Sequence, residues 1–382
     1  MIVAGVMSGT SADGINVALV RVTAGRGGWP TFKCIAHAEY PYPSRVRQTI
    51  LKTMNASQAR VADLARLNFL LAELYAEAIL AAQRRFRITV ELVGCHGQTL
   101  YHQGEARPFA GRRLAVTWQT GEGAVIAARV GAPVVSDFRP ADMAHGGRGA
   151  PLVPFLDYLQ YRDTRVGRII QNIGGIANLT AIPVGASPAR VIAFDTGPGN
   201  MVIDAVSGQL CGKPYDRDGH MASSGVVLDR VVMAILRGRF FQQPPPKTAG
   251  REEFGREFVA NFLRRCGGAK KADVVATATA LTARSIAEGI RRFVLTTPKS
   301  YAELVVSGGG AKNPALMGML AEAVRPLDLA IRRSDEFGLP SDAKEAIAFA
   351  LLAYQTWECR PSNLPSATGA KRPAILGKLS YA

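Results

Sequence analysis

The sequence predicts an α/β protein made of two similar halves, and three patterns lead to this expectation. Strand-like and helix-like segments alternate along the chain. An apolar strand, a turn of small residues and a second apolar strand open the chain and occur again over residues 168–182. Two further glycine turns follow apolar strands, at residues 195–200 and 307–313. Such alternation favours an α/β architecture, so we expect an internally duplicated protein with a cleft between two lobes.

The limits of the two lobes follow from length and composition. A chain of 382 residues is long enough for two domains that each bury a core. No low-complexity linker separates the halves, so we place the boundary at Asp137, where a loop rich in glycine and proline begins. The expected N-terminal lobe is residues 1–136, completed by the tail 361–382, and the C-terminal lobe is residues 137–360.

The elements of the first half are expected from their apolar patterns. Runs of β-branched and apolar residues predict strands, and a stripe of alanine and leucine at helical spacing predicts a helix. In order, we expect a hairpin over 2–22, a helix over 57–85, a strand over 89–95 that ends at His96, a strand over 113–119, a helix over 121–129 and a strand over 133–136. Residues 137–154 are expected to be irregular, and a loop of that length inside a compact domain is usually functional.

The second half repeats this logic. In order, we expect a hairpin over 168–182, a strand over 191–194, a helix over 272–293, a strand over 304–306, a helix over 345–356 and a short strand at 375–376. The small residues of the second hairpin turn are Gly174 and Gly175.

The first hairpin turn, MSGTSADGIN over residues 7–16, predicts a phosphate site. It offers backbone N–H groups, side-chain hydroxyls and the carboxylate of Asp13 at one point. Phosphate oxygens need such donors, a magnesium ion needs an acid to hold its water shell, and glycines permit close approach. A purely structural hairpin would more often carry Asn-Gly or Asp-Gly between polar flanks.

Asp195 is the best candidate for a catalytic group. We expect it at the end of an apolar strand, before a Gly-Pro-Gly turn, where its carboxylate can accept a proton from water or a hydroxyl. The alternative is an Asx-type cap of that turn. The glycines Gly308, Gly309 and Gly310 either lie against an adenine or a ribose or form a flexible loop.

Three further segments stay open between a functional and a structural role. His96, beside Gln98, either orients a sugar or is an ordinary core residue. Asp216 and Asp218 either bind a metal or a hydroxyl or lie in a solvated turn. Lys247 follows three prolines in a segment expected to be a stiff surface loop, from which it can reach a phosphate or a carboxylate.

Composition and missing motifs exclude several classes of protein. The chain is 48% hydrophobic and 20% charged, as is ordinary for globular proteins, and no apolar run is long enough to predict a membrane span. It contains no P-loop, no Rossmann fingerprint, no HExxH motif, no GxSxG elbow and no protein-kinase signature.

Cysteine usage and charge indicate the cellular setting. The five cysteines are scattered without a CxxC pair, which argues against a disulfide framework or zinc site and favours a reducing cytoplasm. No secretion signal is visible. The net charge is +16, but the basic pairs are short, dispersed and not interleaved with aromatic residues. We therefore expect no nucleic-acid partner, and interpret the excess as solvated surface that also attracts anionic substrates.

Nine segments together resemble the anhydro-N-acetylmuramic acid kinase family. They are MSGTSADG, GCHGQT, SDFRPADMAHGGRGAPLVP, QNIGGIANLT, FDTGPGN, PPKTAGREEFG, SGGGAKNP, SDEFGLPSDAKEAIAFALLA and LPSATGA, in this order over almost the whole chain. The family belongs to the actin, hexokinase and heat-shock ATPase superfamily. The resemblance therefore implies a two-lobed actin-like ATPase fold of the ribonuclease H-like type, with the active site in the interlobe cleft.

The resemblance also implies a reaction and its cofactors. ATP phosphorylates O6 of 1,6-anhydro-N-acetylmuramic acid while a water opens the anhydro bridge at the anomeric carbon. The products are N-acetylmuramic acid 6-phosphate and ADP, within peptidoglycan recycling. Mg²⁺ accompanies the nucleotide and helps to neutralise the transferring phosphoryl group. A homodimer is also suggested.

These implications can be placed on residues of this chain. Asp195 activates the water, and sugar binding is expected at His96, Gln98 and Glu345, the last of which precedes the final apolar helix. Magnesium is expected at Asp13. ATP binding is expected at Thr10, Ser11, Ala12, Asp13, Gly14, Ile15, Asn16, Val17, Gly174, Gly175, Gly308, Gly309 and Gly310.

Three positions depart from the family pattern. Asn16 stands where an acid is usual, Arg148 where glutamine is common, and Thr120 where an apolar residue is usual. If the missing acid holds the water shell of the metal, Asp13 alone remains to do so. Two alternatives stay open: a kinase of a plainer anhydrosugar such as levoglucosan, and a non-catalytic nucleotide-binding protein, which Asn16 motivates.

Overall fold

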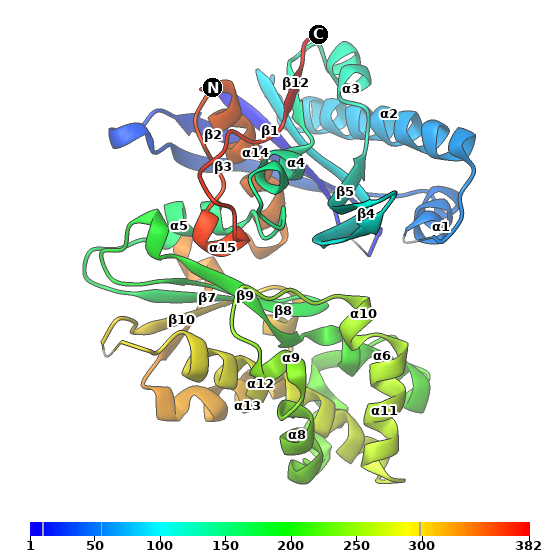
Figure 1. The fold of residues 1–382 in the computed structure, drawn as a ribbon, viewed down its shortest axis with the longest axis vertical. Coiled ribbons are helices and arrows are strands. Elements are labelled where there is room, and N and C mark those ends of the chain that lie inside the picture. Colours follow the sequence, from blue (N-terminus) through cyan, green and yellow to red (C-terminus); the bar gives the residue numbers. More distant parts are fainter. Residues whose placement is uncertain (10, 55, 298) are drawn as a thin grey trace. The chain divides into compact units, whose positions relative to one another are not determined.

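The computed structural model describes residues 1–9, 11–54, 56–297 and 299–382, and it divides into two compact units (Figure 1). Unit 1 comprises Met1–Gln160 and Asp342–Ala382, and unit 2 comprises Tyr161–Ser341. Each unit has its own β-sheet. The expected lobes differ from these units in two segments, because residues 137–160 and 342–360 pack here with unit 1.

The sheet of unit 1 has the strand order β12-β6-β4-β1-β2-β3, with β5 paired to β4. The strands β1, β2 and β3 form an antiparallel meander, β4 is parallel to β1, and β6 is parallel to β4. The strands are β1 (Ile2–Ser8), β2 (Gly14–Thr23), β3 (Thr31–Pro41), β4 (Leu92–Phe109), β5 (Arg112–Thr120), β6 (Val134–Ser136) and β12 (Lys378–Ser380).

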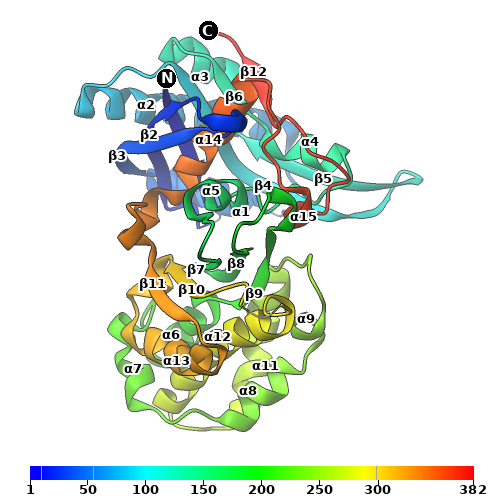
Figure 2. The same ribbon diagram turned by 90° about the vertical axis from the view of Figure 1, so that its left-hand side faces the viewer.

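A buried helix, α14 (Lys344–Trp357), packs directly on this sheet (orange in Figure 2). Its close approach is possible because the facing strand positions are glycines. A Cβ atom at Gly5 of β1 would lie 1.8 Å from the carbonyl oxygen of Ala346, and one at Gly94 of β4 would lie 2.2 Å from that of Phe349. The other helices of the unit are α1 (Ser44–Thr53), α2 (Val61–Phe86), α3 (Gly123–Val130), α4 (Phe138–Ala144), α5 (Pro154–Tyr161) and α15 (Pro365–Thr368).

The sheet of unit 2 has the order β11-β10-β7-β8-β9. Its strands are β7 (Arg168–Ile173), β8 (Ile176–Ile182), β9 (Ile192–Pro198), β10 (Glu303–Ser307) and β11 (Ala330–Arg333). Its helices are α6 (Asn200–Cys211), α7 (His220–Ser224), α8 (Asp229–Leu236), α9 (Arg239–Gln242), α10 (Arg251–Phe254), α11 (Arg256–Cys266), α12 (Lys271–Phe293) and α13 (Pro314–Val324). The long helix α12 packs against β9, where Gly289 lets the side chains of Phe194 and Thr196 approach.

The two sheets share one topology. In each, an antiparallel meander of three strands is followed by a long connection and then by a strand parallel to the first strand of the meander. A further parallel strand follows at the same side in both sheets. The duplication predicted from the two glycine-turn hairpins is therefore confirmed by the strand order.

Two expected strand ends were wrong, and both strands are longer than their apolar runs. The fourth strand does not end at His96, because β4 continues by pairing with β5 as far as Phe109. Its register with β1 shifts between Val6 and Ser8, beside Gly97, whose φ of +75° makes a local irregularity. Likewise β9 pairs with β8 as far as Pro198, so Asp195 lies within a strand and not at its end.

Two other local expectations were also wrong. Residues 138–144, expected to be irregular, form α4; its proline lies in the first turn, where a helix needs no N–H donor. The strand expected at residues 375–376 is absent from the described structure, and the tail pairs instead through β12 with β6.

Among the described residues, no single helix is long and apolar enough to cross a membrane. Two consecutive segments, Arg217–Ser224 and Asp229–Leu236, reach the length and apolar composition of a membrane span only if they are counted together, and they are bent by 110° relative to each other. Both parts contribute buried side chains to the core of unit 2, including Ala222, Val231 and Val232.

Candidate active site

In the turn between β1 and β2, the described residues Ser11 and Asp13 are exposed. The N–H of Ala12, which has a φ of +52°, donates to the carbonyl of Gly9 over 3.1 Å. Arg47 of α1 contacts Asp13 Oδ1 at 3.0 Å. Of the residues predicted to bind ATP, Ser11 and Asp13 are exposed, Gly14 and Asn16 are half-buried, and Ala12, Ile15 and Val17 are buried. Thr10 lies outside the described residues.

A buried network of hydroxyl and amide groups connects this turn to the core of unit 1. Ser8 Oγ donates to Gln98 Oε1 over 2.6 Å, and Gln98 Nε2 donates to the carbonyl of Gly9 over 3.3 Å. Tyr42 donates its hydroxyl to Ser8 Oγ over 3.0 Å. The side chain of Gln98 therefore braces the turn, and a direct contact of Gln98 with sugar stays a prediction.

The donor set of the turn fits a magnesium ion that arrives with a nucleotide. Mg²⁺ keeps several waters and is usually bound by one or two carboxylates together with substrate phosphates. Asp13 offers one exposed carboxylate, and Arg47 contacts only one of its oxygens. Within the described ranges, no group of three or more His, Cys, Asp or Glu side chains can hold a metal. The turn thus suits a hydrated ion and not a cage made by protein ligands alone.

Asn16 lies on β2 and is held by a neighbouring histidine. Its Oδ1 lies 2.9 Å from Nε2 of His37 on β3, and its partner in the strand register is Glu39. Burial lowers the pKa of His37, with Glu39 among the groups that oppose this shift. The position where the resemblance implies an acid is therefore occupied here by a neutral amide that is hydrogen-bonded to His37.

His96 is buried and uses both ring nitrogens within unit 1. Its Nδ1 lies 2.8 Å from the carbonyl of Gly97, and its Nε2 accepts from Nη2 and Nε of Arg139 at 2.8 and 3.1 Å. Burial and the nearby Arg139 hold the pKa of His96 well below its usual value. The imidazole is therefore neutral, with its proton on Nδ1, and it orients the guanidinium of Arg139.

Glu345 lies in the first turn of α14 beside two cations. Glu345 is an exposed residue, yet desolvation by the surrounding protein raises the pKa of its carboxyl group, and Arg139 and Lys344 oppose that shift. Lys344 also forms an ion pair with Asp157 of α5, with 2.7 Å between Nζ and Oδ1 and both side chains buried. Burial lowers the pKa of Arg139 to about 10, opposed by Glu345 and Asp142. The start of α14 is thus a cluster of compensating charges.

In unit 2, the turn at Gly174 and Gly175 is joined to the start of α6. The N–H of Asn200 donates to the carbonyl of Gly174 over 2.7 Å, and that of Gly199 donates to Gly175 over 2.9 Å. A Cβ atom at Gly199 would lie 2.1 Å from the carbonyl oxygen of Gly174, so this junction requires glycine.

The three glycines after β10 form an ordered turn that packs on the end of β7. Gly308 has a φ of +86°, and a Cβ there would lie 2.6 Å from Asn172 Oδ1. A Cβ at Gly310 would lie 2.3 Å from Ile173 Cγ2. Asn313 then caps α13 through the N–H of Leu316. Close packing explains two of these glycines, and their contact with adenine or ribose stays a prediction.

Asp195 is held in β9 by a segment that follows in the sequence. The N–H of Ala249 donates to Asp195 Oδ2 over 2.6 Å, and the N–H of Asp195 donates to the carbonyl of Lys247 over 3.1 Å. Burial raises the pKa of Asp195 to about 7; Glu252 adds to this shift, and the Ala249 N–H and Lys247 oppose it. A carboxylate with such a pKa is matched to proton abstraction near neutral pH.

Two of the open alternatives are decided by these contacts. Asp216 accepts from the N–H groups of Met221 and Ala222, each over 3.0 Å, so it caps α7. It forms no metal site with Asp218 in the described structure. Lys247 lies in an irregular segment that is largely exposed, as expected, but its own side chain is only 3% exposed and therefore does not reach out from that loop.

Sequence patterns did not single out Arg139, Asp157 or Lys344. Each is a charged residue in or beside an otherwise apolar segment, and a buried charge usually has a partner. A charged residue in an apolar segment can therefore be recognised from the sequence as a candidate for a buried ion pair, but the sequence does not show which residue is its partner.

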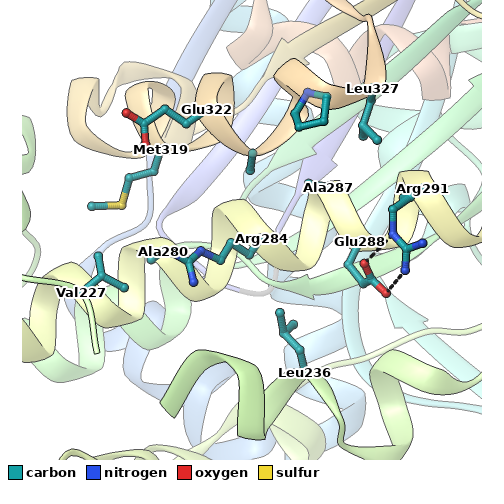
Figure 3. A pocket seen from close by; sticks show the side chains of 12 residues that line it. Val227, Leu236, Ala280, Arg284, Ala287, Glu288, Arg291, Met319, Glu322 and Leu327 are labelled. Atoms are coloured by element: carbon teal, nitrogen blue, oxygen red, sulfur yellow. Dashed lines mark hydrogen bonds and ion pairs between the residues drawn. The ribbon is translucent and has the colours of Figure 1, made fainter. Parts of the chain in front are cut away.

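An open hollow of about 550 Å³ lies elsewhere in unit 2, among α8, α12 and α13 (Figure 3). None of the predicted site residues lines it. Two of its arginines are already paired, Arg291 with Glu288 and Arg284 with Asp229. Because ligand pockets usually converge a few available polar groups on one point, these charges do not mark a second site.

The two sheets with their shared strand order and glycine turns define the class of the protein, a duplicated α/β fold of two units. The family model described as "Anhydro-N-acetylmuramic acid kinase" matches residues 1–382. The chain therefore belongs to the anhydro-N-acetylmuramic acid kinase family, and it is a kinase.

Individual relatives agree with this family. The chain is 41% identical to the anhydro-N-acetylmuramic acid kinase of Bacillus cereus (strain 03BB102), over 100% of this chain and 99% of the relative. It is 42% identical to that of Caldanaerobacter subterraneus subsp. tengcongensis, over 99% and 96%. Among solved structures, component A of (R)-2-hydroxyglutaryl-CoA dehydratase from Acidaminococcus fermentans is similar with a TM-score of 0.44 and 12% identity, over 93% of this chain and 98% of that one. A likeness of that degree adds nothing to the assignment.

Proposed function

We propose that the chain uses ATP to phosphorylate O6 of 1,6-anhydro-N-acetylmuramic acid while water opens the anhydro bridge. The observation that carries this proposal is Asp195, whose carboxylate has a pKa of about 7 and is oriented by a backbone N–H in a family of kinases of this sugar. A general base near pH 7 must be ionised in much of the population and basic enough to accept a proton.

In the proposed reaction, hydrolysis of the anhydro bridge and phosphoryl transfer are coupled. The carboxylate of Asp195 takes a proton from water, and the water oxygen forms a bond to the anomeric carbon. The bond from that carbon to O6 breaks, and O6 forms a bond to the γ-phosphorus as ADP leaves. The products are N-acetylmuramic acid 6-phosphate, ADP and the proton on Asp195, which passes to solvent.

Charge and shape support the placement of the substrates. The β1–β2 turn with Asp13 is proposed to bind the phosphates, with a hydrated Mg²⁺ that neutralises charge on the transferring phosphoryl group when bound. The glycine turns at 174–175 and 308–310 are proposed to complete the nucleotide site. Glu345 is proposed to bind the sugar.

We propose that His96 and Gln98 contribute to sugar binding largely indirectly, by orienting neighbouring groups. His96 orients Arg139, whose guanidinium can meet an anionic or hydroxylic group of the sugar, and Gln98 orients the phosphate turn. We further infer a homodimer from the resemblance. A reducing cytoplasm is supported by five free thiols.

Asp195→Asn tests the base directly, because it keeps the shape of the side chain and removes its basicity. We expect turnover to fall by about 10²–10⁴-fold, the usual worth of a general base, while binding of a non-hydrolysable ATP analogue is retained. ADP release and calorimetry are the two measurements. Asp229→Asn is the matched control, since Asp229 is an exposed acid of the same unit paired only with Arg284 on the surface. Unchanged turnover of Asp195→Asn would contradict the assignment of the base.

Substrate identity needs a separate comparison. Purified protein is assayed for ADP release with 1,6-anhydro-N-acetylmuramic acid and with levoglucosan, which lacks the acetamido and lactyl groups. We expect the amino sugar to be the better substrate by kcat/KM. Turnover of levoglucosan alone would refute the proposed substrate and leave the kinase activity standing.

A further inference from the structure

A lysine is buried next to the proposed catalytic base. The side chain of Lys247 is 3% exposed, and its Nζ donates to the carbonyl of Phe240 over 3.1 Å. The ammonium lies 4.8 Å from the ring centres of Phe240 and Phe293, and 5.6 Å from that of Phe194. Lysine is almost never fully buried without a partner, because desolvating the charge is costly. Three aromatic faces and one carbonyl offset part of that cost.

The same residue begins the stretch of backbone that clasps Asp195. The carbonyl of Lys247 accepts from the N–H of Asp195, and the N–H of Ala249, two residues later, donates to the carboxylate. One ring of the cage, Phe194, is the neighbour of Asp195 in β9. The buried side chain therefore anchors two backbone groups: the carbonyl of Lys247, which binds the N–H of Asp195, and the N–H of Ala249, which binds its carboxylate.

The charges around this pair come from two helices. Glu252 on α10 acts on Asp195 and favours its protonated form, whereas Lys247 favours the ionised form. Arg292 on α12 acts on Lys247. Burial, followed by Arg292, lowers the pKa of Lys247 to about 8, opposed by Asp195. At neutral pH the ammonium thus remains largely charged, and it is a cation that counteracts the burial of the proposed base.

We propose that Lys247 is a positioning residue for Asp195: its caged ammonium anchors residues 247–249 against Asp195 and supplies a positive charge that acts on its carboxylate. This role rests on the proposed function, in which Asp195 is the base. It requires no contact between Lys247 and either substrate. Removal of the positive charge, with the volume of the side chain kept, therefore changes the pH at which the enzyme becomes active.

The test is the pH dependence of kcat/KM in full-length protein, measured by ADP release with the anhydro amino sugar. Lys247→Met keeps an unbranched side chain among the phenyl rings and removes the charge. We expect the acidic limb of its profile to move to higher pH, with a loss of about tenfold on the limb for each unit of movement. The alkaline plateau should stay close to that of the unsubstituted enzyme.

Three companion variants make the result specific. Lys247→Arg keeps the charge, and its acidic limb should stay in place. Lys213→Met removes an exposed lysine of the same unit and should leave the profile unchanged. Phe240→Leu keeps Lys247 but removes one face of the cage, so the limb should move in the same direction by a smaller amount. If Lys247→Met shows no cooperative transition in thermal unfolding and is therefore not folded, the pH profile of Phe240→Leu provides the test instead.

Two results overturn the inference. If Lys247→Met, or Phe240→Leu in its place, lowers activity equally at every pH, Lys247 is only a structural plug. An equal shift in Lys247→Met and Lys247→Arg would also refute the role of the charge. Both outcomes differ from failure of the proposed function, which appears as retained activity of Asp195→Asn at all pH values.

Discussion

The second strand of each sheet carries an asparagine whose partner on the third strand is an acid. In unit 1 the pair is Asn16 and Glu39, and in unit 2 it is Asn178 and Asp195. In unit 1 the asparagine amide is bound by a histidine of β3. In unit 2 the acid itself is bound, by a backbone N–H that arrives from residues 247–249. The same strand pairing is therefore used differently: in unit 1 the asparagine side chain is hydrogen-bonded, and in unit 2 the side chain of the acid is.

The difference originates in the long connection that follows the third strand. In unit 1 this connection consists of α1 and α2 and covers the sheet with an apolar face. In unit 2 it runs from α6 to α12 and includes the extra segment with Lys247 and Ala249. Topology thus positions an acid in the third strand of both sheets, whereas the inserted connection determines whether that acid becomes a candidate base.

The two units also balance buried charge in different ways. In unit 1, Lys344 is paired with Asp157 and Arg139 lies beside Glu345. In unit 2, the buried Lys247 has aromatic rings and a carbonyl around its ammonium. Breaking an ion pair leaves the other charge without its partner, whereas removing one ring of an aromatic cage leaves the remaining contacts of the cation in place.

The largest effect on stability is expected from breaking the buried ion pair of unit 1. Asp157→Ala leaves the ammonium of Lys344 buried and unpaired, so the free energy of unfolding should fall by about 3–5 kcal/mol. Urea unfolding followed by circular dichroism measures this. The double variant Asp157→Leu with Lys344→Met should recover much of the loss, because no charge is then left buried. A loss below about 1 kcal/mol in the single variant would show that the pair behaves like a surface salt bridge.

The next effect compares how the two core helices pack on their sheets. Gly5→Ala in β1 brings a methyl group within 1.8 Å of the backbone of α14, which has no flexible end that can yield. We expect a loss of about 3 kcal/mol or more in the free energy of unfolding. Gly289→Ala in α12 meets only side-chain atoms, the nearest at 3.3 Å, and gains helix propensity, so its change should be below about 1 kcal/mol. Equal losses would contradict this contrast.

A smaller effect, on catalysis, is expected from the cation beside Glu345. Arg139 lowers the pKa of Glu345 against the effect of desolvation, so Arg139→Met should raise that pKa and leave more of the acid protonated at neutral pH. The KM for sugar should rise by about tenfold, equivalent to about 1.4 kcal/mol, with a smaller change for ATP. Raising the pH should restore part of the loss. A larger change in the KM for ATP would place Arg139 with the nucleotide.

The smallest effect is expected at the asparagine of unit 1. Asn16→Asp supplies the acid that the resemblance implies at this position, which adds about 1 kcal/mol of attraction to a hydrated cation. The Mg²⁺ concentration for half-maximal activity should fall by about fivefold, and the nearby His37 should titrate at higher pH. Magnesium titration of ADP release and NMR of the histidine measure the two changes. Asn178→Asp, at the equivalent strand position in unit 2, is the comparison variant and should not increase magnesium affinity.

The site could be predicted from sequence where a residue acts through its own local conformation. The apolar runs, the glycines of the turns and the choice of Asp195 as a candidate base came from the sequence alone, whereas its place within β9 did not. His96 was also visible, but its bond to Arg139 joins residues 43 positions apart. No local period relates two such residues, so its role as an acceptor for the guanidinium was not predictable.

The sequence by itself determined the two glycine-turn hairpins, the duplicated α/β plan, the family and the acid in β9. These depend on strand-forming runs, on glycine conformation and on residue order, all of which are local properties of the chain. Only the tertiary structure decided that β4 extends past His96, that Lys344 meets Asp157, and that a caged Lys247 anchors the donor to Asp195. Burial and partner choice arise when distant segments pack together, and they set the charge of a group that the sequence can only name.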